Sequence, residues 1–205
     1  MRRRRDGEHL RRAELALSGR LARLKETLAH YQRSTSDDSG LIWAAVAVII
    51  APDPDSILLI RRADRQGDPW SGHMALPGGR REPADQDLLA TAIRETGEEV
   101  GLALARSDLL GSIDDVVPRT PVLPPVAVRP FVFLMAGRSS LLLSSEVAEA
   151  SWVTIDDLVR ADRHGLISLE VAGETRQFPA YQLDGAIVWG MTERILASLL
   201  GHMLG

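Results

Sequence analysis

Cysteine is absent from all 205 residues of the chain, which excludes disulfide bonds, thiolate metal sites and cysteine nucleophiles. Lysine is almost absent as well. Lys25 is the single one, so any phosphate group bound elsewhere must be held by arginine or by a metal ion. Long hydrophobic runs are missing too, because the longest, Leu41 to Pro52, is too short to span a bilayer. No apolar stretch of the secretory kind follows the N-terminal arginines, so we expect a cytoplasmic protein without a membrane partner.

Charge is distributed unevenly between the N-terminal segment and the rest. Residues 1–35 carry ten Arg or Lys against four Asp or Glu, while the whole chain has a net charge of −4. The run Arg2–Arg5 suits nucleic acid or anionic lipid, but we expect a solubilising tail and no nucleic-acid partner. From Glu8 to Tyr31 apolar residues recur at helical spacing, which predicts an amphipathic helix. That helix either packs on the domain or pairs with another subunit in a homodimer. We therefore divide the chain into 1–35 and a single domain over 36–205.

The whole chain is 45% hydrophobic and 25% charged, which is typical of a globular protein with a substantial core. Its short apolar stretches alternate with helical patterns, and this order predicts an α/β fold with a mixed sheet. We expect strands over 41–50, 56–60, 73–76, 109–117, 127–135, 149–155 and 177–183, and helices over 85–100, 155–161 and 188–203.

Residues 78–102 form the most informative stretch. At about 100° per helical residue, Glu95, Glu98 and Glu99 fall on one face of the predicted helix. Three carboxylates so close repel one another, and a divalent cation removes the conflict. Hard oxygen ligands of this kind suit Mg²⁺ or Mn²⁺. The alternative is a solvated helix face on which Arg94 pairs with Glu98 at i,i+4.

The order Arg-Glu-x-x-Glu-Glu-x-Gly-apolar over 94–102, introduced by the glycine turn at 77–79, resembles the signature of the Nudix hydrolases. Two departures are present. The gap between the turn and the arginine is one residue longer than in the family, and the family's first glutamate falls at Gln86. Asp85 and Asp87 flank that position and can take over its supporting role.

The resemblance implies an α/β/α sandwich with a mixed sheet, preceded here by the N-terminal helix. It also implies hydrolysis of a small molecule, a nucleoside diphosphate linked to a group X, into a nucleoside monophosphate and phospho-X. By analogy, the three glutamates hold the metal with a backbone carbonyl near Gly79, and Arg94 orients them. The general base is either Glu98 or a carboxylate on a later loop. The later candidates are Glu146, Glu149, Asp114 and Asp115.

Phosphate contacts are expected from arginines. Arg61 and Arg62 follow a strand, so one should face each side of the sheet, and Arg80 directly follows the glycine turn. Arg129 lies within a strand pattern and has either a substrate role or a structural ion pair. Trp70, in a loop before the turn, either stacks on the substrate or caps the core.

The lead-in at 76–79 and the closing segment AIVWGMTERIL at 186–196 resemble the coenzyme A pyrophosphatase-like branch of the family. The branch's own coenzyme A motif is altered, because Asp68 and Trp70 stand where it has Arg and His. Because of the likeness of these two segments, coenzyme A and its derivatives are nevertheless one expected substrate class. Nucleotide sugars, dinucleoside polyphosphates and deoxynucleoside triphosphates are the alternatives, and a Nudix-fold binding module without catalysis is a further one.

Overall fold

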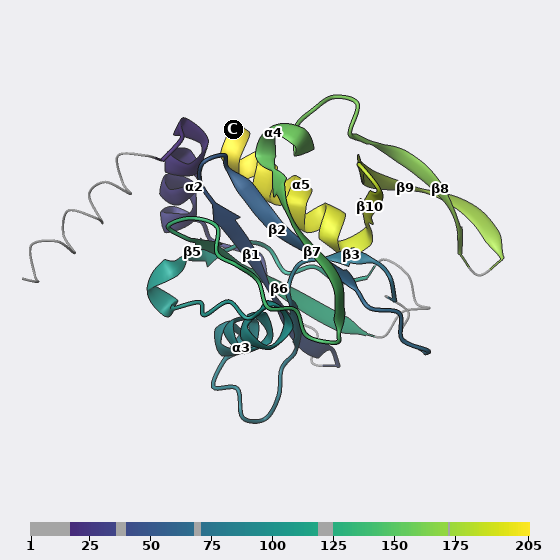
Figure 1. The fold of residues 1–205 in the computed structure, drawn as a ribbon, viewed down its shortest axis with the longest axis horizontal. Coiled ribbons are helices and arrows are strands. Elements are labelled where there is room, and N and C mark those ends of the chain that lie inside the picture. Colours follow the sequence, from purple (N-terminus) through teal and green to yellow (C-terminus); the bar gives the residue numbers. More distant parts are fainter. Residues whose placement is uncertain (1–16, 36–39, 68–70, 119–124, 172) are drawn as a thin grey trace, which may run out of the picture.

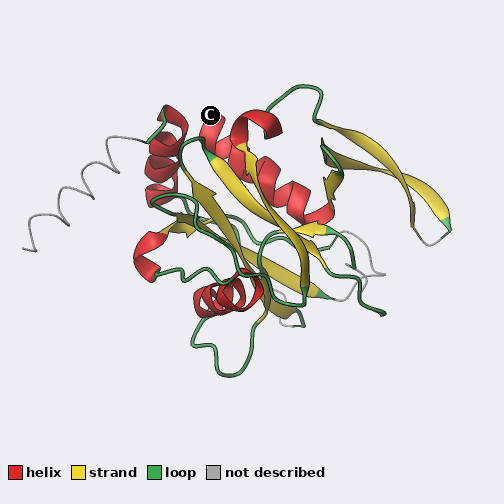
Figure 2. Cartoon of the chain, viewed as in Figure 1, coloured by secondary structure: helices red, strands yellow, loops and turns green. Residues whose placement is uncertain are grey.

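The computed structural model describes residues 17–35, 40–67, 71–118, 125–171 and 173–205. A mixed sheet forms the centre of the molecule, with helices on both of its faces, and a second, smaller sheet projects from one side (Figures 1 and 2). The elements are α2 (Gly19–His30), β1 (Ile42–Ala51), β2 (Ser56–Arg62), β3 (Met74–Ala75), β4 (Gly78–Arg80), α3 (Leu88–Val100), the 3₁₀ turn η1 (Arg106–Asp108), β5 (Leu109–Ser112), β6 (Val126–Leu134), β7 (Val147–Thr154), α4 (Ile155–Leu158), β8 (His164–Val171), β9 (Glu174–Leu183), β10 (Ala186–Trp189) and α5 (Gly190–Leu204).

The central sheet has seven strands, ordered β3-β2-β1-β6-β5, with β4 paired to β1 and β7 paired to β2. Strand β1 runs parallel to β6 from Ile42 to Ile50, and the other pairings of this sheet are antiparallel. A parallel pair needs a long crossover, and here the crossover contains α3. Because both faces of β1 are covered, its second half, from Ala47 to Ala51, is completely buried.

Two hydrophobic clusters lie on opposite faces of this sheet. One joins the sheet to α3 through Leu89, Ala92 and Val100, and the other joins it to α2 and α5. The α/β/α sandwich is therefore confirmed. Helix α2 contributes the buried side chains Leu21 and Leu24, so of the two alternatives for the N-terminal helix the structure shows packing on the domain.

Several predicted boundaries were wrong. The signature helix begins at Leu88 rather than at residue 85, because the Asp87 side chain caps it by accepting the Ala90 amide at 2.7 Å. The strand predicted over 109–117 ends at Ser112, the helix over 155–161 ends at Leu158, and the closing helix begins at Gly190 because 186–189 form β10. The first half of the predicted N-terminal helix, residues 8–16, lies outside the described residues.

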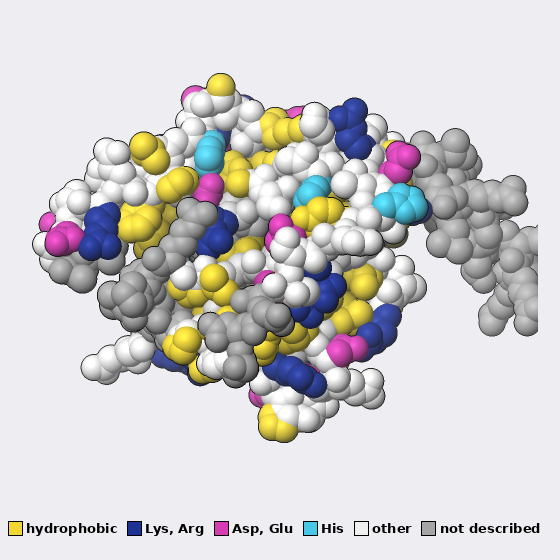
Figure 3. Space-filling model, turned by 180° about the vertical axis from the view of Figure 1, so that it is seen from behind, with side chains coloured by type: hydrophobic (Ala, Val, Ile, Leu, Met, Phe, Trp, Pro, Cys, Tyr) yellow, Lys and Arg dark blue, Asp and Glu magenta, His cyan; other side chains and the backbone are white. Residues whose placement is uncertain are grey.

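Strand β8 was missed altogether. It pairs with β9 over all of its eight residues, and β10 completes this three-stranded sheet. The side chains from His164 to Glu170 are half-buried or exposed, so the sequence lacks the apolar run of a buried strand. The β8–β9 hairpin projects from the body of the molecule, and hydrophobic side chains reach the surface there as elsewhere (Figures 1 and 3). No helix in the described part of the chain combines the length and the apolar character that crossing a bilayer requires.

Candidate metal and catalytic site

Helix α3 presents its three glutamates to different environments. Glu99 is buried against the sheet at 4% exposure, the side chain of Glu95 is 17% exposed and that of Glu98 is 60% exposed. The helix ends at Gly101, which adopts the left-handed conformation at φ 70° and returns its amide to the Gly97 carbonyl at 3.1 Å. A Cβ atom at Gly101 would lie 2.8 Å from the Cβ of Leu142, so both the backbone angle and the close packing require glycine here.

The glycine turn lies directly against two of these carboxylates. Strand β4 pairs with the first half of β1, which places Gly78 opposite Val46. The Gly78 amide donates to Glu99 Oε2 at 2.9 Å. A Cβ atom added to Gly79 would overlap the carboxylate of Glu95, so the space that a side chain would fill is left to that carboxylate. Gly79, Glu95 and Glu99 are thus brought together, as the sequence predicted.

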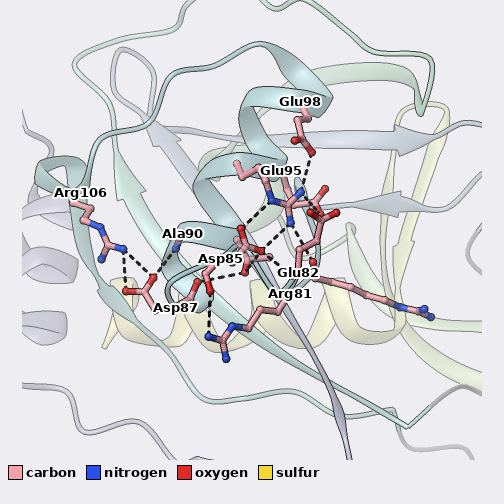
Figure 4. A network of polar contacts seen from close by, with 11 residues as sticks. Arg81, Glu82, Asp85, Asp87, Ala90, Glu95, Glu98 and Arg106 are labelled. Atoms are coloured by element: carbon pink, nitrogen blue, oxygen red, sulfur yellow. Dashed lines mark hydrogen bonds and ion pairs between the residues drawn. The ribbon is translucent and has the colours of Figure 1, made fainter.

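Arg94 connects the carboxylates of Asp85, Glu95 and Glu98, which are labelled in Figure 4. Its guanidinium donates to Glu95 at 3.0 Å, and to Glu98 at 2.9 Å in the i,i+4 pair that was predicted. It also donates to both carboxylate oxygens of Asp85 at 3.0 Å and to the Arg80 carbonyl at 3.2 Å. A single guanidinium therefore fixes the relative positions of two helix glutamates and of the loop after the glycine turn.

Asp85 provides the support that the resemblance assigns to the Gln86 position. Its side chain is buried, and it also accepts hydrogen bonds from the Glu82 amide and the Thr91 hydroxyl, each at 2.9 Å. The hydrogen bonds from Arg94 hold the pKa of Asp85 well below its usual range. Gln86 itself is exposed, so the role has moved by one residue toward the turn.

Burial shapes the electrostatics of the two inner glutamates. It raises the pKa of Glu99 to about 7, although the hydrogen bond from Gly78 acts in the opposite direction. Burial also raises the pKa of Glu95, against the nearby positive charge of Arg94. Two residues from other elements act on Glu99 as well, since the charge of Arg62 lowers its pKa and the charge of Glu146 raises it. Both therefore lie close to the site.

The fold places Glu146 and Glu149, two of the candidates for the general base outside α3, in different surroundings. Glu146 lies in the loop before β7, which is held to the end of α3 by the bond from the Ser144 amide to the Glu99 carbonyl at 3.0 Å. Arg65, which the sequence did not single out, pairs with Glu146 at 2.9 Å. Glu149 pairs instead with Arg61 at 3.2 Å.

Asp114 and Asp115 are engaged in structural contacts. Asp114 accepts the Tyr31 hydroxyl at 2.8 Å and the Ser34 amide at 2.6 Å. Asp115 binds Arg129 through both oxygens at 2.8 and 2.9 Å, and its side chain is 1% exposed. Arg129 also lies 5.0 Å from the ring centre of Trp43. Of the two alternatives for Arg129, a substrate role or a structural ion pair, the contacts show the ion pair.

The remaining arginines are divided between the two faces of the sheet. Arg62 lies on the side of α3, whereas Arg61 lines a cleft of about 460 Å³ between β2, β7 and the β9–β10 turn, where it donates to the Gly185 carbonyl at 3.0 Å. The alternation predicted for these two residues is therefore present, and it leaves only Arg62 beside the glutamates. Arg80 is exposed next to the glycine turn, and Trp70 lies outside the described residues.

The donor set fits a hard divalent cation. Among the described residues, no group of three or more acidic, histidine or cysteine side chains already converges as a metal site. The reason is local, because Arg94 draws Glu95 and Glu98 to itself while Glu99 turns to the Gly78 amide. Nevertheless, carboxylate oxygens crowded in a partly buried space are the ligands that Mg²⁺ and Mn²⁺ take, and a cation would offset the burial of Glu99.

Comparison with known proteins agrees with this geometry. Residues 41–171, from β1 to β8, match the model of the NUDIX domain. The chain is 41% identical over 108 residues to an uncharacterized protein of Schizosaccharomyces pombe, a match that covers 50% of this chain and 33% of the yeast protein. It is 26% identical over 175 residues to an uncharacterized Nudix hydrolase, NudL, of Yersinia pestis, covering 84% of this chain and 83% of that protein. Its fold is similar to that of a MutT/nudix family protein from Enterococcus faecalis, with a TM-score of 0.61 and 19% identity, over 87% of this chain and 68% of that one.

Replacing Asp85 by Asn should weaken both the fold and metal binding, because it removes the most deeply buried of the three carboxylates that bind Arg94. We expect a loss of about 3 kcal/mol in the free energy of unfolding, measured with urea, and weaker Mn²⁺ binding by calorimetry. The matched control is Gln86→Ala, at the neighbouring exposed position, which should change stability by less than about 0.5 kcal/mol. Equal effects of the two substitutions would show that Asp85 does not hold this network.

The metal-free protein should lose stability as the pH rises from about 4.5 to about 7. Burial raises the pKa of Glu99, so in this range the folded state binds more protons than the unfolded state. The contribution of this group is fully present below the ordinary glutamate pKa and is lost as the pH passes about 7. Urea unfolding in EDTA at several pH values measures the slope. Glu99→Gln should reduce it, whereas the exposed control Glu26→Gln should leave it unchanged; an unaltered slope in Glu99→Gln contradicts the assignment.

Proposed function

The chain belongs to the Nudix family, and on that premise we propose that it is a divalent-metal-dependent hydrolase of nucleoside diphosphates linked to a group X. The observation that carries the proposal is the contact of the glycine turn with Glu95 and Glu99, because it gathers hard oxygen donors at one end of a buried helix. The alternative of a binding module without catalysis is less well supported, since the three glutamates of the Arg-Glu-x-x-Glu-Glu motif are all present on α3.

Metal binding in this proposal rests on Glu95, Glu98 and Glu99, with a backbone carbonyl of the glycine turn. When bound, Mg²⁺ or Mn²⁺ neutralises the charge of the diphosphate and lowers the pKa of a bound water. Arg94 holds Glu95 and Glu98 in place from behind and does not touch the substrate. Because Arg94 is itself anchored on Asp85, the glutamates keep their positions when the substrate leaves.

In the reaction, the oxygen of a water forms a bond to one phosphorus of the diphosphate, and the anhydride bond to the bridging oxygen breaks. The bridging oxygen leaves with the second phosphate, which gives a nucleoside monophosphate and phospho-X. We assign the role of general base, which accepts the proton of the attacking water, to Glu146. This carboxylate lies near Glu95 and Glu99 and belongs to a different segment from the metal-binding helix. Glu98 is the weaker candidate for the base because this proposal already uses its carboxylate as a ligand of the metal.

Substrate binding requires cations beside the glutamates, and Arg62 and Arg80 are the residues so placed. Arg61 and Arg129 are held by Glu149 and Asp115, which leaves them less suited to the phosphates. Coenzyme A and its derivatives are the substrate class that we propose first, on the likeness of the segments at 76–79 and 186–196 to that branch. Nucleotide sugars, dinucleoside polyphosphates and deoxynucleoside triphosphates are the competing classes.

A panel of diphosphate compounds tests this function with Mg²⁺ and with Mn²⁺. It holds coenzyme A, acyl-coenzyme A, ADP-ribose, NADH, nucleotide sugars, dinucleoside polyphosphates and deoxynucleoside triphosphates. We expect a nucleoside monophosphate, or 3′,5′-ADP from coenzyme A, together with phospho-X. Glu98→Gln should lower turnover about 100-fold or more, because a ligand of the cation is lost. If no compound is turned over with either metal, the hydrolase is rejected in favour of the binding module.

The base is tested by a matched pair of substitutions in one segment. Glu146→Gln should lower kcat by about 10²- to 10⁴-fold while Mn²⁺ binding, measured by calorimetry, is retained. Glu149→Gln, three residues further along and paired with Arg61, should leave kcat within about twofold, because surface substitutions away from a site have small effects. Full activity of Glu146→Gln would return the role of base to Glu98.

A further inference from the structure

The sheet β8–β9–β10 has two faces of different character. One face packs on α5 through the buried side chains Tyr181 and Val188, which pair across β9 and β10, and through His164, which contacts Glu193 on α5 at 2.8 Å. Side chains alternate along a strand, so the neighbouring positions point the other way. We call this second side the outer face and define it by Ile167, Leu169, Phe178 and Trp189.

The outer face is a continuous apolar strip. Ile167 lies directly opposite Phe178 in the β8–β9 pair, and the rings of Phe178 and Trp189 lie 5.3 Å apart. Ile187, two residues before Trp189 and therefore on the same face, is 47% exposed. Four residues along a strand span about 14 Å, which is the distance from Trp189 to the level of Leu169. A cation, Arg176, follows opposite Leu169 at the far end.

The near end of this strip lies next to β3. The ring of Trp189 lies 5.1 Å from that of His73. His73 is adjacent to β3, and its carbonyl accepts the Arg62 amide at 3.0 Å. Arg62 is followed by Ala63, whose amide donates to the Glu146 carbonyl at 2.9 Å, and the Ser144 amide of the same loop donates to the Glu99 carbonyl at 3.0 Å. A ligand whose phosphate binds beside the glutamates and Arg62 therefore meets apolar side chains in the direction of the hairpin.

We propose that the outer face binds an extended apolar arm of the group X, so that the β8–β9 hairpin selects diphosphates whose second phosphate carries methylene or methyl groups. The inference rests on the proposed function, because it takes the glutamate site as the place where the phosphate binds. The strip extends over the three short strands of this sheet and is bounded by the polar residues Gln182 and Arg176. It is thus small beside the roughly 1,200 Å² or more that a stable protein interface buries, which favours a ligand arm over a second copy of the chain.

The test uses n-alkyl phosphates as probes, since they present a phosphate and a bare apolar arm. Their binding to the full chain is measured by calorimetry with Mg²⁺ present, for n-butyl and n-octyl phosphate. In wild type we expect the octyl compound to bind about tenfold more tightly, because the added methylenes are partly removed from water. The double variant Ile167→Ser/Phe178→Ser should abolish the difference, and the single variant Ile167→Ser should reduce it.

The matched control is Leu166→Ser. Leu166 is the neighbour of Ile167 on β8 but points to the other side of the sheet, where it is 63% exposed, so its replacement should leave the tenfold difference intact. Circular dichroism of all variants verifies that the hairpin remains folded. If the double variant does not fold, the comparison is made with Ile167→Ser alone. Equal affinities of the two probes for wild type overturn the proposal, as does an equal loss in Leu166→Ser.

Light scattering after gel filtration tests whether the outer face is instead covered by a second copy of the chain. A wild-type dimer that becomes a monomer in Ile167→Ser/Phe178→Ser would assign the outer face to a second copy and overturn the proposal. Binding is measured without turnover, so the two proposals fail separately. Equal binding of both probes by an enzyme that turns over the substrate panel rejects the apolar arm alone. Tighter binding of the longer probe by a chain that turns over nothing rejects the hydrolase alone.

Discussion

The burial of the Glu99 carboxylate is the constraint on which the rest of the site depends. Glu99 lies between α3 and the sheet and accepts the Gly78 amide at 2.9 Å, which ties the helix to the glycine turn. Burial disfavours the charged carboxylate, and the domain has no lysine to compensate it. The chain instead places one backbone amide and Arg62 nearby. The remaining imbalance is what a divalent cation relieves, so the strain of the folded site and its proposed chemistry have one physical origin.

Arg94 keeps the carboxylates close to one another when no cation is bound. It binds Glu95 and Glu98 on the helix and Asp85 in the preceding loop, so that like charges are separated by a guanidinium. In the proposed metal complex, the helix glutamates would therefore exchange the arginine for a metal ion as their partner. The anchor on Asp85, beside the exposed Gln86, shows that a role can move by one residue when the loop before the helix is one residue longer.

Much of the fold and of the central site could be predicted because both depend on local periodicity. The helix that carries Glu95 and Glu99, the glycine at its end and the mixed α/β order follow from spacing within short windows. The start of that helix was predicted too early, at Asp85, because the contacts that make Asp87 the cap and pair Asp85 with Arg94 form only in the folded protein. Strand β8 was missed because its pairing with β9 stabilises it without burying an apolar run.

The sequence by itself determined which donors are available for the proposed metal chemistry, because residue type and helical spacing already place three hard oxygen donors on one surface and exclude thiolate and lysine chemistry from the domain. Only the tertiary structure decided which of the distant residues join them. Glu146 and Glu149, or Arg61 and Arg62, are equivalent in sequence, but the pairing of β2 with β7 brings one of each to the glutamates and sends the other to the opposite face. The physical reason is that strand register and alternation, which act between segments far apart in the chain, select the neighbours of a site.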